Sequence, residues 1–401
     1  MVRKKKMLFV MNTLGRAGAE RALMALMRLL DPEKYEIFLY VLIPRGEVFR
    51  EVPSYVRILN RKTDSRSVLS GRGRLFVARR LAKAAVKPQS IRKALVRLRG
   101  DRQRPKAEKI LRRMLADGAE PLLQRFDVAV AYLEGPATWY VAEKVQAPVK
   151  IAFLHIDYSR AGYTREQDEG CYGVFDRIYA VSKDVKEGFL SVYPEYAGKT
   201  RIFFNIIDKE RIGRLSEEAG GFRDTCEGMR LLTVGRLYYQ KGYDLAVQTA
   251  ALMKENGYRF RWYVLGEGVE RRRLQKQIRK AELEDTFILL GAVDNPYPYF
   301  RQADIYICTS RYEGKSMVIE EARMLGKPVA AVRCTGIEEQ IRSGIDGIVA
   351  DFDPEDLAKA VQELMEDPKR RADYGKAAAR QVSCGERGLA DFFSLLEERK
   401  L

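Results

Sequence analysis

The sequence predicts an α/β protein made of two successive Rossmann-like domains with parallel sheets. Three observations carry this prediction. Short apolar or alternating runs typical of strands alternate with helical patterns along almost the whole chain, as βαβ units require. A chain of 401 residues is long enough for two such domains, each with its own core. Apolar residues become sparse between Asp208 and Glu227, which predicts the interdomain linker there.

The first domain is expected to span residues 1–207. Its strands are expected at Met7–Thr13, Glu36–Ile43, Asp127–Leu133, Val149–Leu154, Arg177–Val181 and Arg201–Phe204. A helix over Ala19–Leu30 follows the first strand after a glycine-containing turn. Residues 61–115 are expected to form a basic helical segment, and a C-terminal helix over 386–401 is expected to complete this domain.

The second domain is expected to span residues 208–385 and to follow the same alternation. Its strands are expected at Arg230–Val234, Arg259–Leu265, Phe287–Leu289, Ile305–Cys308, Pro328–Ala331 and Gly347–Ala350. Helices are expected to begin near Lys241, Val269, Ser316, Gly336 and Asp353. Two doubly wound domains create one natural ligand site, the crevice at the carboxyl ends of their strands.

Composition excludes several classes of protein. Hydrophobic residues make up 46% of the chain and charged residues 32%, which is typical of a globular protein and not of a disordered one. No apolar run approaches the roughly 18–20 residues of a membrane span, and Met7–Met11 is too short for a signal peptide. Five cysteines without a CxxC pair and a single histidine, His155, disfavour a disulfide framework and a structural zinc site. We therefore expect a cytoplasmic protein.

Most of the net charge of +17 lies in one segment. Residues 61–113 hold 19 Lys or Arg but only three acidic residues, Asp64, Asp101 and Glu108. A pair of helices with solvated cationic faces is the simplest interpretation. Nucleic-acid binding is disfavoured, because the segment has one aromatic residue, Phe76, and no known binding module. We favour attraction to an anionic membrane surface, where each Lys or Arg contributes about 1 kcal/mol.

The sharpest local pattern is RYEGKSMVIEEA, residues 311–322. A turn after a strand precedes Ser316, which is a good N-cap for the helix that follows. At 100° per residue, Glu321 falls inside the apolar arc of this helix, whereas Glu320 and Arg323 fall outside it. A carboxylate on a buried face needs hydrogen-bond donors. Ribose hydroxyls would supply them, and so would a structural network of backbone amides.

The same helix start is a ready anion site, because the backbone N–H groups of Ser316, Met317 and Val318 have no acceptor within the helix. Lys315 stands beside this helix start, and Lys241 stands at the start of another helix, after the loop that holds Arg236. A cation at a helix amino end opposes the helix dipole at a cost of about 0.3–1 kcal/mol. An anion such as a diphosphate between the two loops would explain these cations, and solvated loop cations are the alternative.

Three segments occur in a specific order and spacing: VGRLYYQKGYD at 234–244, LGEGVERRRL at 265–274, and the pair of glutamates E-x7-E at Glu313 and Glu321. Together they resemble family 4 of the retaining glycosyltransferases, strongly over the C-terminal half and more weakly over the N-terminal half. This family has the GT-B architecture, in which two facing Rossmann-like domains clamp a nucleotide-sugar donor. The resemblance is to bacterial enzymes of cell-envelope polysaccharide assembly.

The resemblance implies a role for each matching residue. It assigns the diphosphate to Arg236, Lys241, Ser316, Met317 and Val318, the ribose to Glu321, the base to Leu290, Gly291 and Val293, and the transferred sugar to Glu313 as a catalytic residue. The sequence departs from the family pattern at one place, which limits what the resemblance implies about the sugar. Lys315-Ser316 stands where many members have Phe-Pro or a similar pair, so the identity of the sugar does not carry over.

The N-terminal half offers two weaker matches. The loop LGRAGAER at 14–21 has Gly15 and Gly18 where the family usually has paired glycines, which would let the backbone approach an acceptor or a phosphate. A plain strand-to-helix turn is the alternative. His155 follows the strand Val149–Leu154 and matches a recurrent histidine of the family, which implies a catalytic contact with the sugar. A structural histidine is the alternative.

The implied reaction moves a sugar from a nucleoside diphosphate to an acceptor hydroxyl with retention, with UDP favoured over GDP and a lipid-linked glycan as the expected acceptor. We expect no cofactor and no metal, because a diphosphate is already a good leaving group and no DxD pair stands at a suitable strand end. Association with the inner face of the cell membrane is expected. A sugar-nucleotide epimerase and a nucleic-acid-binding protein are the alternatives, whereas a nicotinamide dehydrogenase is disfavoured by the lack of GxGxxG after the first strand.

Overall fold

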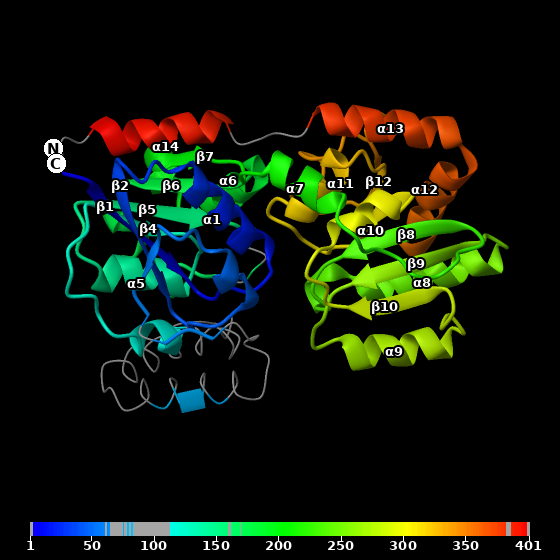
Figure 1. Cartoon of the computed structure of the whole chain (residues 1–401), viewed down its shortest axis with the longest axis horizontal. Helices are drawn as coiled ribbons and strands as arrows, with labels where there is room; N and C mark the ends of the chain where they lie inside the picture. Colours follow the sequence, from blue (N-terminus) through cyan, green and yellow to red (C-terminus); the bar gives the residue numbers. More distant parts are fainter. Residues whose placement is uncertain are drawn as a thin grey trace. The chain divides into compact units, whose positions relative to one another are not determined.

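The chain folds into two compact units. A computed structural model describes residues 3–60, 62–64, 75, 78, 79, 82, 113–158, 161, 163–168, 170–381 and 386–398. The N-terminal unit is Met1–Ile206 with Gly385–Leu401, and the C-terminal unit is Ile207–Cys384 (Figure 1). The predicted boundaries between the two domains, 207/208 and 385/386, each lie one residue further along the chain. Most of the basic segment predicted at 61–115 lies outside the described residues.

The N-terminal unit is built on a seven-stranded sheet in the order β3-β2-β1-β4-β5-β6-β7, with every neighbouring pair parallel. The strands are β1 (Lys5–Met11), β2 (Tyr35–Val41), β3 (Arg57–Ile58), β4 (Val128–Ala131), β5 (Val149–Leu154), β6 (Arg177–Ala180) and β7 (Thr200–Ile202). The strand order reverses between β1 and β4, which is the usual ligand position in such a sheet.

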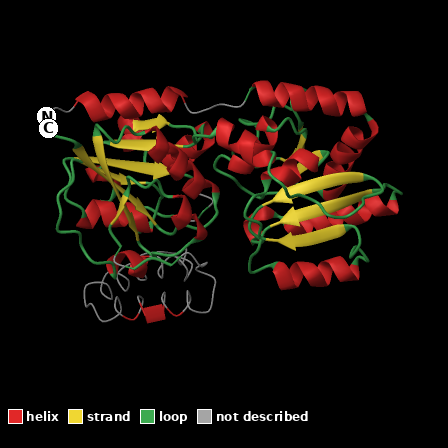
Figure 2. Cartoon of the chain, viewed as in Figure 1, coloured by secondary structure: helices red, strands yellow, loops and turns green. Residues whose placement is uncertain are grey.

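Helices cover both faces of this sheet (Figure 2). The α-helices are α1 (Gly18–Leu29), α5 (Pro136–Lys144), α6 (Lys183–Val192) and α14 (Glu386–Glu398), and the 3₁₀ turns are η1 (Glu47–Glu51), η2 (Tyr172–Val174) and η3 (Pro194–Lys199). Helix α14 returns from the C-terminal end of the chain and buries Phe392 against Phe153, Tyr179 and Phe203. The Tyr179 hydroxyl donates to Asp391 at 2.7 Å. These contacts make α14 part of the first core, where the sequence analysis puts residues 386–401.

The C-terminal unit has a six-stranded parallel sheet in the order β10-β9-β8-β11-β12-β13. The strands are β8 (Met229–Val234), β9 (Phe260–Leu265), β10 (Phe287–Gly291), β11 (Ile305–Cys308), β12 (Val329–Val332) and β13 (Ile348–Ala350). The strand order reverses between β8 and β11. The helical elements are α7 (Lys209–Ser216), η4 (Tyr239–Lys241), α8 (Tyr243–Glu255), α9 (Arg271–Lys280), α10 (Tyr297–Gln302), α11 (Met317–Met324), α12 (Pro354–Glu366) and α13 (Pro368–Arg380).

The predicted α/β class with two doubly wound parallel sheets is therefore confirmed. Two local predictions are wrong. The segment predicted as an irregular linker contains α7, because the Asp208 side chain caps the helix at Arg211 N and Ile212 is buried on its inner face. No helix begins near Gly336, whose positive φ of 80° belongs to a turn that passes close to the carbonyl of Gly314.

Candidate functional site

Two loops meet at the carboxyl edge of the second sheet, where the strand order reverses. One loop follows β8 and the other follows β11. The backbone N–H of Arg311 donates to the Gln240 carbonyl at 2.8 Å, and the Thr309 hydroxyl donates to the Lys241 carbonyl at 2.8 Å. Gly242 has φ of 62°, and a Cβ there would lie 1.9 Å from the Thr309 carbonyl oxygen. Only glycine permits this close approach, so the sequence itself locks the two loops together.

A buried ion pair joins the two loops at their centre. The Lys241 ammonium lies 2.6 Å from Glu313 Oε1, and the two side chains are 19% and 9% exposed. The Ser310 hydroxyl donates to the same carboxylate oxygen at 2.6 Å. Burial alone would lower the pKa of Lys241, but the attraction of Glu313 outweighs it and the pKa of the ammonium is raised. Lys241 therefore stays charged over the whole physiological range.

Arg236 supplies a second cation to this edge of the sheet. Its exposed guanidinium lies over the ring of Tyr238, 5.2 Å from the centroid, and is close enough to Lys241 to oppose the rise in that group's pKa. No carboxylate pairs with Arg236 among the residues that the structure describes. The two cations predicted to bind a diphosphate are thus neighbours in the same unit.

The residues predicted to line a base pocket lie on the adjoining strand ends. The amide of Gly266 donates to the Gly291 carbonyl at 2.8 Å, and the amide of Leu237 donates to the Glu267 carbonyl at 3.0 Å. These bonds fasten the loop after β9 between the ends of β10 and β8. Leu290 is 40% exposed at the end of β10, where an apolar surface is free to meet a flat ligand, and Val293 follows in the next turn.

The amino end of α11 differs in one respect from the prediction. Ser316 occupies the N-cap position, but its side chain makes no capping bond. Instead, Gln340 Oε1 accepts the Ser316 amide at 2.8 Å, and Gln340 Nε2 donates to the Ser316 carbonyl at 2.9 Å. The prediction that the Ser316 amide lies open at the helix start is therefore wrong for this structure. The amides of Met317 and Val318 begin the helix and have no acceptor within it.

Glu321 lies on the buried side of α11, as its position in the helical arc predicts. Its residue is 1% exposed, and Oε1 accepts a hydrogen bond from the Tyr297 hydroxyl at 3.3 Å. The contact of Glu321 with ribose stays a prediction. The tyrosine supplies one of the donors that a buried carboxylate requires.

The predicted outward positions of Glu320 and Arg323 are wrong. Both are buried, at 2% and 4% exposure, because each has charged partners: Asp346 before β13 pairs with Arg323, and Glu320 lies beside Arg323 itself. Arg323 lies 3.2 Å from the buried Asp346 and 3.7 Å from Glu320. The ammonium of Lys315 lies 3.8 Å from Glu320, so this lysine faces the interior network.

The remaining predicted residues lie in the N-terminal unit. Gly15 is in the loop after β1, where an added Cβ would meet nothing closer than 4.0 Å, and Gly18 is the first residue of α1. His155 follows β5, its amide donates to Glu134 Oε2 at 2.8 Å, and its ring packs on Tyr132 at 5.0 Å. Burial lowers the pKa of His155 to about 3, so the imidazole is neutral. Within the described residues, His155 Nε2 has no hydrogen-bond partner.

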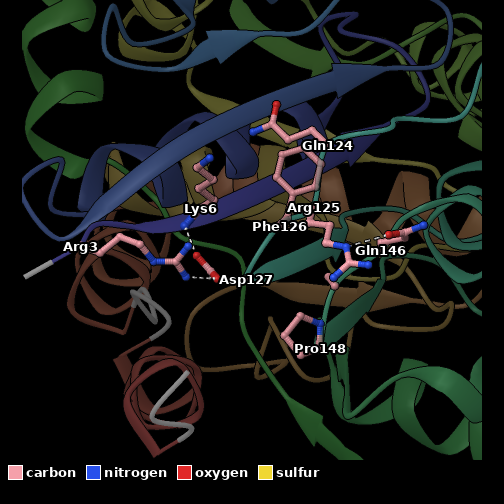
Figure 3. A pocket seen from close by; sticks show the side chains of 9 residues that line it. Arg3, Lys6, Gln124, Arg125, Phe126, Asp127, Gln146 and Pro148 are labelled. Carbon is pink, nitrogen blue, oxygen red and sulfur yellow. Dashed lines mark hydrogen bonds and ion pairs between the residues drawn. The ribbon is translucent and has the colours of Figure 1, made fainter.

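A pocket of about 540 Å³ in the N-terminal unit lies away from all of these residues (Figure 3). It opens at the amino ends of β1, β4 and β5, whereas Gly15 and His155 follow the carboxyl ends. Arg3 donates to Asp127 Oδ1 at 2.6 Å across it. The pocket therefore does not belong to the candidate site.

Sequence reasoning missed three residues that shape the C-terminal site. Ser310, Gln340 and Tyr297 hold Glu313, Ser316 and Glu321 respectively. Ser310 carried a usable signal, because a hydroxyl three residues before a glutamate in a turn can reach its carboxylate. Gln340 and Tyr297 carried none, because each lies 24 residues from its partner in the sequence.

Comparison with known families decides what this unit is. Residues 227–381 match the family model of the glycosyl transferases group 1. The C-terminal unit is a group 1 glycosyltransferase domain. The match spans all six strands of the second sheet and includes the Lys241–Glu313 pair of the group 1 domain. It confirms the resemblance inferred from the sequence motifs.

Relatives of the chain include bacterial glycosyltransferases. The chain is 29% identical over 212 residues to the N-acetylgalactosamine-N,N'-diacetylbacillosaminyl-diphospho-undecaprenol 4-alpha-N-acetylgalactosaminyltransferase of Campylobacter jejuni, which covers 52% of this chain and 55% of the relative. It is 31% identical over 151 residues to the amylovoran biosynthesis glycosyltransferase AmsD of Erwinia amylovora, covering 37% and 42%. The chain thus spans about half or less of the length of these relatives.

Solved structures match the whole fold. HepE from Anabaena, in complex with UDP-glucose, superposes with a TM-score of 0.67 at 16% identity, over 97% of this chain and 99% of HepE. Sucrose-phosphate synthase from Thermosynechococcus elongatus matches with a TM-score of 0.65 at 14% identity, over 99% and 98%. At this identity the likeness establishes the GT-B fold, as the sequence predicts.

Of the helices in the described part of the chain, none has both the length and the hydropathy needed to cross a bilayer. Across the same residues, no group of three or more His, Cys, Asp or Glu is arranged as ligands for a metal ion.

Proposed function

We propose that the protein is a retaining glycosyltransferase that moves a sugar from a nucleoside diphosphate, UDP in preference, to an acceptor hydroxyl. The observation that carries this proposal is the Lys241–Glu313 ion pair, which lies near Arg236 and is followed in the chain by the amino end of α11. This arrangement offers cations and backbone amides to a diphosphate and a carboxylate to a sugar. The UDP-glucose complex of HepE, which has the same fold, supports a UDP-sugar donor.

Charge separation is the main barrier to the proposed reaction. As the glycosidic bond to the diphosphate breaks, negative charge grows on the phosphate oxygens and positive charge on the sugar ring. Lys241 and Arg236 stabilise the negative charge, together with the helix dipole and the amides of Met317 and Val318. No general acid is required, because the leaving group is a diphosphate and not an alcohol.

Glu313 acts on the other side of the breaking bond. Its carboxylate would accept hydrogen bonds from the sugar hydroxyls and would stabilise positive charge on the ring. Lys241 and Ser310 fix Oε1 of this carboxylate, which limits its reorientation during the reaction. We assign the ribose hydroxyls to Glu321 and the base to the backbone of Leu290, Gly291 and Val293.

The N-terminal unit would supply the acceptor side. We assign Gly15 and Gly18 to the approach of an acceptor or a phosphate, and His155 to a hydrogen bond with the transferred sugar. Neutral imidazole suits that role, because it both donates and accepts hydrogen bonds without adding charge. A lipid-linked glycan in cell-envelope polysaccharide synthesis is the proposed acceptor, which agrees with the names of the Campylobacter and Erwinia relatives.

Transfer without a metal or another cofactor is part of the proposal. Two protein cations and a helix start can do for the diphosphate what a divalent ion does in other transferases. The basic segment 61–113 would hold the enzyme at the inner face of the cell membrane through its positive charge.

A donor panel tests the proposed function. Thermal shifts with UDP-, GDP- and ADP-sugars identify the nucleotide, and release of the nucleoside diphosphate in the presence of glycan or lipid-linked acceptors measures transfer. The same assay in excess chelator should retain its rate. Interconversion of the sugar without release of the diphosphate would indicate an epimerase and would overturn the proposal, as would the lack of any response to nucleotide sugars.

A further inference from the structure

Two donors converge on one oxygen of Glu313. The Lys241 ammonium and the Ser310 hydroxyl each lie 2.6 Å from Oε1. Within the described residues, Oε2 makes no hydrogen bond. The carboxylate thus has one oxygen that is held and one that is open to a ligand.

The two donors differ in what a bound donor nucleotide would do to them. Lys241 is one of the two cations assigned to the diphosphate, so the carboxylate and the diphosphate compete for a single ammonium group. Ser310 is 2% exposed, and Glu313 is the only anionic group among its described contacts. When Lys241 turns to the diphosphate, Ser310 is the donor that stays on Oε1.

The surroundings of Ser310 commit its single proton to Glu313. A serine hydroxyl has one O–H to donate and lone pairs to accept. The Cys308 thiol donates a hydrogen bond to Ser310 Oγ, with 3.6 Å between sulfur and oxygen. Burial raises the pKa of this thiol, which keeps it protonated and able to donate. Ser310 therefore accepts from Cys308 and donates to Glu313.

The backbone of Ser310 is also held in place. It lies two residues after the end of β11, and the neighbouring Thr309 hydroxyl donates to the Lys241 carbonyl at 2.8 Å. The Glu313 amide donates to the Thr335 carbonyl at 3.3 Å. Both ends of the Ser310–Glu313 hydrogen bond thus rest on fixed backbone.

We propose that Ser310 is a positioning residue, which keeps the Glu313 carboxylate directed at the transferred sugar after Lys241 has moved to the donor diphosphate. This inference rests on the proposed function. It assigns no contact with substrate to Ser310, and it predicts that the hydroxyl contributes to turnover and not to nucleotide binding.

Three substitutions at this position test the inference. Ser310→Ala removes the hydroxyl, Ser310→Cys keeps the shape but offers only a weak donor, and Ser310→Thr keeps the hydroxyl. Ser216→Ala is the matched control, because Ser216 is a buried serine of the same unit whose hydroxyl bonds the Gly213 carbonyl. UDP affinity is measured by calorimetry, and kcat and donor KM by release of UDP during transfer.

We expect Ser310→Ala and Ser310→Cys to lower kcat about tenfold to a hundredfold, the usual effect of losing one hydrogen bond to a charged group. The UDP Kd should stay within about twofold of wild type. Ser310→Thr should recover most of kcat, and Ser216→Ala should leave it unchanged. UDP binding also reports whether each variant has folded.

Two results would overturn the inference. One is a kcat near the wild-type value in both Ser310→Ala and Ser310→Cys. The other is a UDP Kd that weakens in step with kcat, which would assign the serine to the binding site as a whole. If the wild-type protein itself transfers no sugar, the proposed function fails instead, so the two failures are distinguishable.

Discussion

The charge of Glu313 can be removed with little change of shape by the substitution Glu313→Gln. The amide oxygen of glutamine can still accept from Ser310 and Lys241, but the buried ammonium loses its counter-charge. Because both side chains are less than a fifth exposed, solvent only partly replaces the lost attraction. We expect the free energy of unfolding to fall by about 1.5–3 kcal/mol, the value of a charge-assisted hydrogen bond.

Binding of UDP should respond in the opposite direction. In the wild-type protein Glu313 competes with the diphosphate for Lys241, whereas the neutral amide in Glu313→Gln holds the ammonium less strongly. If the diphosphate gains about 1 kcal/mol of interaction with Lys241, the Kd for UDP becomes roughly fivefold tighter. Denaturant titrations with and without UDP measure both effects on one protein. Sugar transfer by this variant should be severely reduced.

The expected loss of stability and the expected gain in UDP affinity have opposite signs, so each can be refuted separately. A variant that binds UDP more weakly than wild type would mean that Lys241 does not exchange between the carboxylate and the diphosphate. Unchanged stability would mean that the ion pair contributes nothing to the folded state. Lys241→Gln in the same background is the control, because it should abolish the gain in UDP affinity.

Three further predictions use other residues. Glu321→Ala should weaken UDP binding about tenfold by calorimetry through the loss of hydrogen bonds to ribose, and a wild-type Kd would remove the ribose assignment. His155 has a pKa of about 3, below its unfolded value, so its contribution to stability is present above about pH 6.5 and is lost as pH falls. His155→Gln should therefore show a shallower loss of stability between pH 7 and 5 in denaturant titrations, and an identical slope would contradict the burial of a neutral imidazole. Sedimentation with vesicles should show salt-sensitive binding to anionic but not to neutral lipid through residues 61–113, and equal binding to both would exclude an electrostatic attachment.

Local periodicity was sufficient to predict the parallel sheets and the inward side of Glu321. A helix places its residues at fixed angles, so an arc of apolar neighbours fixes which face is buried. The convergence of the loops holding Lys241 and Glu313 also follows from the strand pattern, because carboxyl ends of parallel strands lie at one edge.

The same reasoning failed where the partner comes from far along the chain. Glu320 and Arg323 fall outside the apolar arc, which predicts outward positions, yet they are buried against Asp346 and Gln340. The amide of Ser316 was expected to be open, yet a side chain 24 residues away accepts it. Helical angles measure only short-range geometry, so they cannot reveal a buried polar network whose members meet through tertiary packing.

The return of α14 to the first core has a practical consequence for dividing the protein. The chain passes from one unit to the other twice, near residues 206 and 384, so the N-terminal unit consists of two separate stretches of sequence, whereas the C-terminal unit is one continuous stretch. Removing the last twenty residues would strip Phe392 from an aromatic cluster in the unit that begins at the opposite terminus. Hybrid enzymes that exchange C-terminal units between relatives should therefore splice at both crossings and keep each N-terminal unit together with its own final helix.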